Sequence, residues 1–206
     1  MTEPATPAEM PTSAPATRPG EPAAPGRQAA PGEPMAIEPD TKDWTWTLRE
    51  TCPDCGFTAS DVDGPSIADR LPALIEPWQA VLARPDAAER PSPTTWSPLE
   101  YACHVRDVCR VFTERVDWML RRNGPQFPNW DQDAAAVAAR YHAQDPATVA
   151  GELRDAAADA RDAFATVEGE QWQRTGVRSD GSEFTVETLG QYFLHDLAHH
   201  LADVRA

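Results

Sequence analysis

The chain has 206 residues, 21 prolines, 11 glycines and a formal net charge of −15. Binding to phosphate groups requires clustered Lys and Arg, but the sequence has a single lysine, Lys42, and its arginines alternate with acidic residues. No apolar run reaches the roughly 18 residues of a membrane span, and the start of the chain lacks the regions of a secretory signal. We therefore expect a cytoplasmic protein that acts on small molecules, not on nucleic acid or a membrane.

Residues 1–41 differ in composition from the rest of the chain. Ten prolines and nine alanines fall within residues 1–40, where large apolar side chains are nearly absent. Such a segment cannot bury enough surface to offset the entropy lost on ordering it, so we predict a disordered tail. Residues 42–206 are numerous enough for one hydrophobic core, and we predict that they form one domain.

The next segment, residues 43–64, is short, aromatic and rich in turn-forming residues. Its alternating Trp44 and Trp46 are typical of an extended chain that lies across a helical body. We therefore interpret this segment as an arm attached to the domain.

The four cysteines are too few for a disulfide scaffold. Cys52 and Cys55 resemble half of a zinc knuckle, but a complete structural zinc site needs four ligands. Cys103 and Cys109 are six positions apart on a predicted helix and point to different sides, so we expect both to be buried as small apolar residues. From Cys52 and Cys55 we expect at most a reducible pair or an adventitious metal site.

Helical periodicity continues through the rest of the chain. Pro72 and Pro77 predict a kinked or broken first helix, whereas Ser97 and Glu100 predict a capping box at the start of the second. A short additional helix is considered within residues 130–141. The four long segments with an apolar helical stripe are residues 66–83, 97–122, 145–167 and 185–204. They predict an all-α fold, a four-helix bundle.

Three histidines occupy positions suited to a metal ion. His195 and His199 are four apart on one helix, so they share a face with Cβ atoms about 5–6 Å apart, although such pairs also occur on protein surfaces. His104 is central to an apolar arc of its helix, which predicts that it points into the bundle. It could be a core histidine with one hydrogen bond. If the three side chains meet, they provide three nitrogen ligands and leave one position open.

The surroundings of these histidines leave further alternatives. On a helical wheel His195 and His199 lie nearly opposite Leu197, so they face solvent or a second, polar interior surface. His200 lies about 100° around the helix from His199, and we expect it to be a surface or supporting residue. Asp107 and Asp196 could accept the second N–H of a metal-bound histidine, or could be solvated acids.

Two motifs resemble the DinB/YfiT-like family of metal-binding proteins. Residues 96–107, WSPLEYACHVRD, are similar to the family signature "WS..E...H..D", and residues 195–200, HDLAHH, are similar to its C-terminal "HD..HH". The resemblance extends over residues 66–204. Within it, WDQD at 130–133 and FTVETLGQYFLHD at 184–196 resemble actinobacterial members.

The resemblance implies a four-helix bundle with one divalent ion, held by His104 of the second helix and by His195 and His199 of the fourth. Imidazole suits zinc, nickel and iron alike. Relatives in this family include thiol S-transferases that use mycothiol or bacillithiol, a mycothiol-dependent maleylpyruvate isomerase, and metal-dependent hydrolases. Because the fold does not choose among these activities, they remain alternatives.

Our first functional hypothesis is a mycothiol-type S-transferase, in which a metal-bound thiolate attacks a small electrophile. To bind an anionic thiol, the site would need arginines such as Arg115 or Arg178. The alternatives are a hydrolase that uses metal hydroxide, with Asp107 or Asp196 moving the proton, and a non-catalytic metal-binding stress-response bundle. Association of two such bundles into a homodimer is also considered.

Overall fold

The computed structural model describes residues 37, 39 and 42–205. The predicted tail, residues 1–41, therefore lies almost wholly outside the described residues. The helices are α1 (Ile67–Ile75), α2 (Pro77–Leu82), α3 (Pro98–Arg121), α4 (Gln132–Ala138), α5 (Pro146–Ala165) and α6 (Val186–Asp203). None of these helices combines the length and the apolar character that crossing a bilayer would require.

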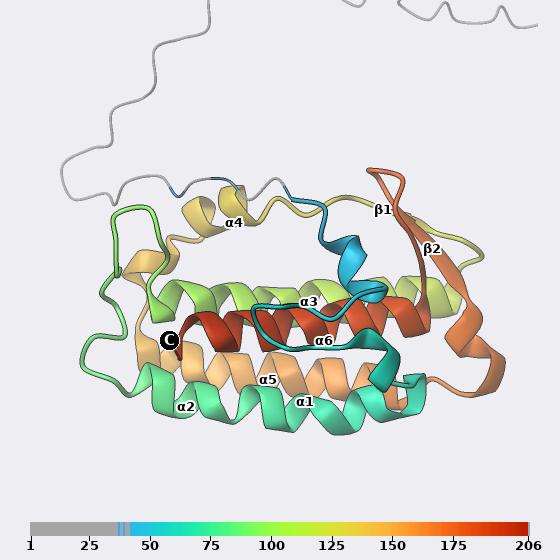
Figure 1. The fold of residues 1–206 in the computed structure, drawn as a ribbon, viewed down its shortest axis with the longest axis horizontal. Coiled ribbons are helices and arrows are strands. Elements are labelled where there is room, and N and C mark those ends of the chain that lie inside the picture. Colours follow the sequence, from blue (N-terminus) through green and yellow to red (C-terminus); the bar gives the residue numbers. More distant parts are fainter. Residues whose placement is uncertain (1–36, 38, 40–41, 206) are drawn as a thin grey trace, which may run out of the picture. The chain divides into compact units, whose positions relative to one another are not determined.

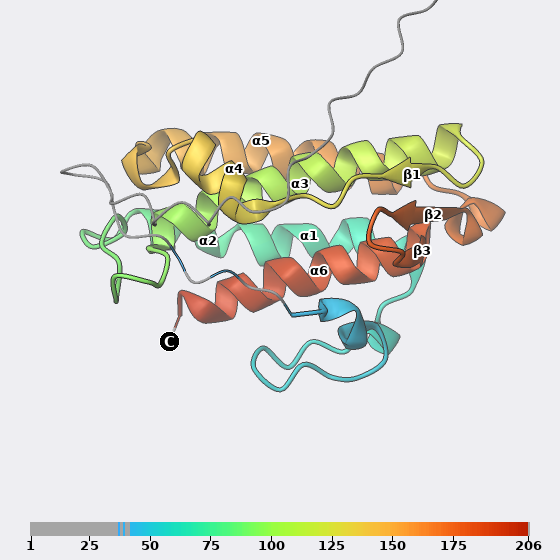
Figure 2. The same ribbon diagram turned by 90° about the horizontal axis from the view of Figure 1, so that it is seen from above.

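The predicted four-helix bundle is confirmed (Figure 1). Helices α1 and α2 follow each other end to end and form one rod, as both Figure 1 and Figure 2 show. This rod, α3, α5 and α6 make the bundle, in which α3 and α1 each contact both α5 and α6. The core between them is filled by fully buried side chains, among them Trp78, Leu153, Phe164, Phe193 and Leu194.

Local sequence signals account for the helix boundaries. The Ser97 hydroxyl accepts a hydrogen bond from the Glu100 amide at 3.2 Å, and the Glu100 carboxylate accepts one from the Ser97 amide at 2.9 Å, so the capping box is present. Glu100 is buried and forms an ion pair with Arg90. The predicted break in the first helical segment is also confirmed, since Pro77 starts α2 directly after α1.

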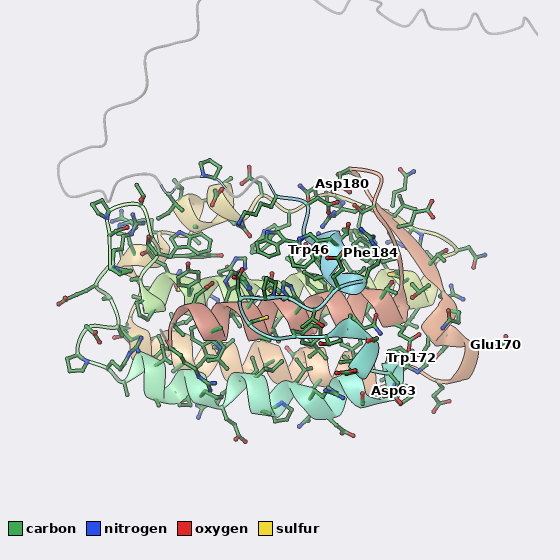
Figure 3. The ribbon with its side chains drawn as sticks, in the orientation of Figure 1. Trp46, Asp63, Glu170, Trp172, Asp180 and Phe184 are labelled. Atoms are coloured by element: carbon green, nitrogen blue, oxygen red, sulfur yellow. The ribbon has the colours of Figure 1, made fainter. Side chains whose placement is uncertain are left out.

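Beside the helices of the confirmed all-α fold lies a small sheet that the sequence did not predict. It consists of β1 (Gln126–Phe127), β2 (Thr175–Arg178) and β3 (Glu183–Thr185), in the order β1-β2-β3. β1 is parallel to β2, and β2 is antiparallel to β3. With two to four residues each, these strands are too short to show an alternating pattern in sequence. Figure 3 labels Asp180, in the β2–β3 turn, and Phe184, in β3, at this end of the bundle.

The arm also differs from its prediction. Trp44 and Trp46 lie in a 3₁₀ helix, η1 (Trp44–Leu48), and not in an extended chain. The physical reason is a cap, because the Asp43 carboxylate accepts a hydrogen bond from the Thr45 amide at 2.9 Å and turns the chain at this point.

Gly190 lets α6 pack closely against its neighbours, which gives a stability prediction. A Cβ atom at this position would lie 2.3 Å from Ile67 Cδ1 and 2.9 Å from Phe164 Cε1. We expect Gly190→Ala to lower the free energy of unfolding by about 1–3 kcal/mol, because the core must shift to admit the methyl group. Urea denaturation measures this change.

Gly151 of α5 is the matched control for this prediction, since a Cβ there would meet nothing within 4 Å. Gly151→Ala should raise the free energy of unfolding by roughly 0.5–1 kcal/mol through helix propensity. Equal effects of the two substitutions would contradict the close packing at Gly190.

Candidate metal centre

Helix α3 carries His104 into the interior, as its apolar arc predicted. The residue is 1% exposed. Its ring lies 5.3 Å from the ring of Trp96 and 5.4 Å from that of Trp130, measured between centroids, and the Trp130 ring stacks on it. On the remaining side the His200 ring of α6 stands perpendicular to it at 4.7 Å. His104 Nε2 faces Asp196 of α6, at 3.5 Å from its Oδ1.

His104 meets Asp196 and His200 on α6, and the three offer ligand atoms that all lie within 4.8 Å of one another. His104 Nε2 is 3.5 Å from Asp196 Oδ1, and His200 Nε2 is 3.9 Å from the same oxygen. Asp196 and His200 are four apart, so both project from one face of the helix. Two imidazoles and a carboxylate are a common donor set for divalent transition metals.

Two features indicate that this group fits a metal ion. His104 Nδ1, His104 Nε2 and Asp196 Oδ1 are buried and have no hydrogen-bond partner among the described residues, although buried polar atoms are normally paired. In addition, His200 Nδ1 lies 3.0 Å from Asp203 Oδ2. A carboxylate at this distance fixes the ring so that the other nitrogen is free to bind a metal.

Burial and charge shift the pKa values of His104 and Asp196 in this group. Burial lowers the pKa of His104, so this ring stays uncharged near neutral pH. Burial alone would raise the pKa of Asp196, but His200 and His104 hold it below its usual range. An ionised Asp196 beside a neutral His104 is a protonation state that suits metal binding.

The structure divides the predicted trio of His104, His195 and His199 between two groups. His195 and His199 project from α6 toward the arm, where their possible ligand atoms lie within 4.8 Å of one another and of those of Cys52 and Cys55. The helical wheel places this pair opposite the apolar arc, facing either solvent or a second interior surface, and in the structure the arm supplies that surface. His200, expected to be a surface or supporting residue, takes the place beside His104.

The two acids suggested as supports also have different surroundings. Asp196 lies within the group itself. Asp107 accepts hydrogen bonds from Arg106 at 2.9 Å, from Arg110 at 2.8 Å and from the Tyr141 hydroxyl at 2.5 Å. Asp107 thus forms its hydrogen bonds with these donors and none with His104 among the described residues, whereas Asp203 lies beside His200.

A cavity of about 940 Å³ opens over this centre. Its wall includes His104, Asp196 and His200, the arm residue Trp44, and Arg115 from α3. Arg178 of β2 also lines it, so both arginines suggested for an anionic reactant face the same space as the histidines. The cavity is large enough for a drug-sized ligand.

Arg115 is a buried cation in this wall. It is 7% exposed and lies over the rings of Phe112 and Phe127, at 5.2 and 4.9 Å from their centroids. It donates a hydrogen bond to the Pro128 carbonyl at 3.1 Å, but it forms no ion pair with any carboxylate in the described part of the chain. Burial and the neighbouring Arg178 lower its pKa to about 10. Arg178, in contrast, pairs with Asp180 at 2.8 Å.

The fold and the centre together define a class: a four-helix bundle that can bind a divalent metal between two of its helices. The sequence profile of the DinB superfamily matches residues 69–204. The chain therefore belongs to the DinB superfamily.

Comparison with solved structures agrees on the fold. YfiT from Bacillus subtilis, described as a probable metal-dependent hydrolase with an unusual four-helix bundle topology, matches with a TM-score of 0.59 and 18% identity. The match covers 72% of this chain and 84% of YfiT. No curated protein matches the chain.

Proposed function

We propose that the chain is a metal-dependent thiol S-transferase that joins a small thiol to an electrophilic substrate in the cavity. The observation that carries the proposal is the group of His104, Asp196 and His200 in the wall of a cavity. The same wall contains the buried guanidinium of Arg115, which forms no ion pair with a carboxylate in the described part of the chain. A divalent ion on these three ligands would lower the pKa of a thiol or a water molecule that completes its coordination.

The surrounding residues have distinct roles in this proposal. Asp203 orients the His200 ring through Nδ1. Trp96 and Trp130 flank His104 and keep bulk water away from it, which strengthens charge interactions within the site. Arg115 binds an anionic group of one reactant, because a guanidinium pairs well with a carboxylate.

The test uses the metal-loaded full chain, mycothiol and a chloronitroarene. The thiol sulfur forms a bond to the ring carbon, chloride leaves with the electrons of the C–Cl bond, and the thiol proton passes to the buffer. We expect the protein to accelerate thioether formation and the reaction to stop when the metal is chelated. If neither mycothiol nor bacillithiol reacts faster with the protein present, the proposal is wrong.

Hydrolysis is the second candidate, and the cavity wall gives a reason to test it. Asp43, Asp131 and Asp203 line the cavity, and carboxylates can move the proton of an attacking water. The description of YfiT as a probable metal-dependent hydrolase also supports this alternative. Cleavage of a carboxylate ester without any thiol would favour it over S-transfer, and the absence of both reactions would favour a non-catalytic metal-binding bundle.

A further inference from the structure

Four potential metal ligands lie outside the centre described above, and the two from α6 lie about 100° around the helix from Asp196 and His200. Cys52 and Cys55 come from the arm, and His195 and His199 come from the helix. Their possible ligand atoms all lie within 4.8 Å of one another. Two thiols and two imidazoles are a donor set typical of structural zinc sites.

The arm is folded so that both thiols face the helix. The Gly56 amide donates a hydrogen bond to the Cys52 carbonyl at 2.8 Å, and the Cys52 amide donates one to the Phe57 carbonyl at 2.9 Å. Gly56 has φ +74°, a backbone conformation that side chains rarely adopt, although the space around it is open. The glycine is therefore required by the turn that closes behind the two cysteines, and not by packing.

The distances and burial match a four-coordinate site. Ligand atoms arranged tetrahedrally around zinc are separated by roughly 3.3–3.8 Å, given Zn–S and Zn–N bonds of about 2.3 and 2.0–2.1 Å. Cys52 Sγ lies 3.6 Å from His199 Nδ1. Cys52 is fully buried, and His195 is 4% exposed with an Nε2 atom that has no hydrogen-bond partner among the described residues.

Aromatic residues cover part of the two histidines, which also line the cavity. The Trp44 ring lies 4.9 Å from the ring of His199 and 5.7 Å from that of His195, and the Phe57 ring lies 5.8 Å from that of His195, between centroids. Four protein ligands complete a tetrahedral site and leave no coordination position for a substrate, which is characteristic of structural and not catalytic zinc.

We propose that Cys52, Cys55, His195 and His199 bind a second divalent metal ion, zinc, which fastens the arm to α6. The consequence reaches the cavity, because the arm residues Asp43, Trp44 and Asp54 form part of its wall. The ion would thus hold in place this part of the cavity wall, which His195 and His199 also line. The site differs from the His104 centre in ligands, face of α6 and purpose, and it does not depend on the proposed activity.

Cobalt spectroscopy on the full chain tests the second site directly. Purified under reducing conditions and stripped of metal, the wild type should bind two Co²⁺ ions per chain. One of them should give the thiolate-to-cobalt charge-transfer absorption and the intense ligand-field bands of a four-coordinate ion. Zinc should displace this signal. A wild-type spectrum without a thiolate band would overturn the proposal, whatever the enzyme assays show.

Three variants separate the two centres. Cys55→Ser should abolish the thiolate band and leave one ion per chain, whereas Cys103→Ser, which changes a cysteine outside the group, should retain both. His104→Ala should lose one ion yet keep the thiolate band. A thiolate band that persists in Cys55→Ser, or that disappears in His104→Ala, contradicts the assignment.

Hydrogen exchange and proteolysis test whether zinc fastens the arm to α6. Hydrogen exchange of the amides in residues 44–58 should slow when zinc is added to the metal-free wild type and should not respond in Cys55→Ser. Trypsin cleavage after the exposed Arg49 should follow the same pattern. An arm that is equally protected with and without zinc would show that the ion does not fasten it.

Discussion

His200→Ala is expected to remove the ion from the His104 centre and to lower kcat/KM of the proposed S-transfer by about 10³-fold. The reason is that the charge stabilisation a divalent ion supplies is worth several kcal/mol, at 1.36 kcal/mol for each tenfold change in rate. His200 is only half-buried, so the substitution should leave the fold intact by circular dichroism. Steady-state kinetics and elemental analysis measure the two effects.

The controls distinguish the two ways of assigning the histidines. His142→Ala, in the 3₁₀ segment after α4 and outside both groups, should change neither metal content nor rate. Asp203→Asn should weaken metal affinity about 10- to 100-fold, as loss of a supporting carboxylate does. If His199→Ala abolishes turnover and His200→Ala does not, then the trio of His104, His195 and His199 is the catalytic set.

The helices were predictable because their signals are local. A capping box such as that of Ser97 and Glu100 satisfies amides of its own first turn, so the start of α3 can be read without knowledge of the rest of the fold. The sheet had no such signal, because β1 pairs with β2 across about 50 residues and each strand is only a few residues long.

The candidate site was harder because spacing alone is ambiguous. Asp196 and His200 have the same four-residue separation as His195 and His199, and only the rotation of α6 against α3 decides which pair meets His104. That rotation depends on packing between helices. The helical wheel indicates only that His195 and His199 lie nearly opposite Leu197. Both pairs have neighbours in the structure, one at α3 and the other at the arm.

The cysteine pair shows the same limit. Cys52 lies 147 residues from His199 in sequence, so the missing half of the zinc knuckle could not be found by looking for other cysteines. The sequence leaves two features unexplained, an incomplete zinc knuckle and a histidine pair that faces away from the core. In the proposed site the cysteines and the histidines supply two ligands each, which explains both features.

Arg115→Met is expected to make the protein more stable and its substrate binding weaker. The guanidinium is buried against Phe112 and Phe127 and has no carboxylate partner in the described part of the chain, so its desolvation is not offset by an ion pair. Methionine fills similar volume without charge, and we expect the free energy of unfolding to rise by about 1–3 kcal/mol. Urea denaturation measures the gain.

The functional effect of the same change should depend on substrate charge. For 4-chloro-3-nitrobenzoate, which carries a carboxylate, we expect KM to rise about 100-fold, since losing a buried charge partner costs at least 2 kcal/mol. For the neutral 1-chloro-2,4-dinitrobenzene KM should stay within about twofold. The matched control is Arg110→Met, on the exposed side of α3. It should leave KM unchanged and change the free energy of unfolding by no more than roughly 0.5 kcal/mol. Binding of an anionic reactant would explain why Arg115 is present although it lowers stability. Equal KM changes for the two substrates would contradict this explanation.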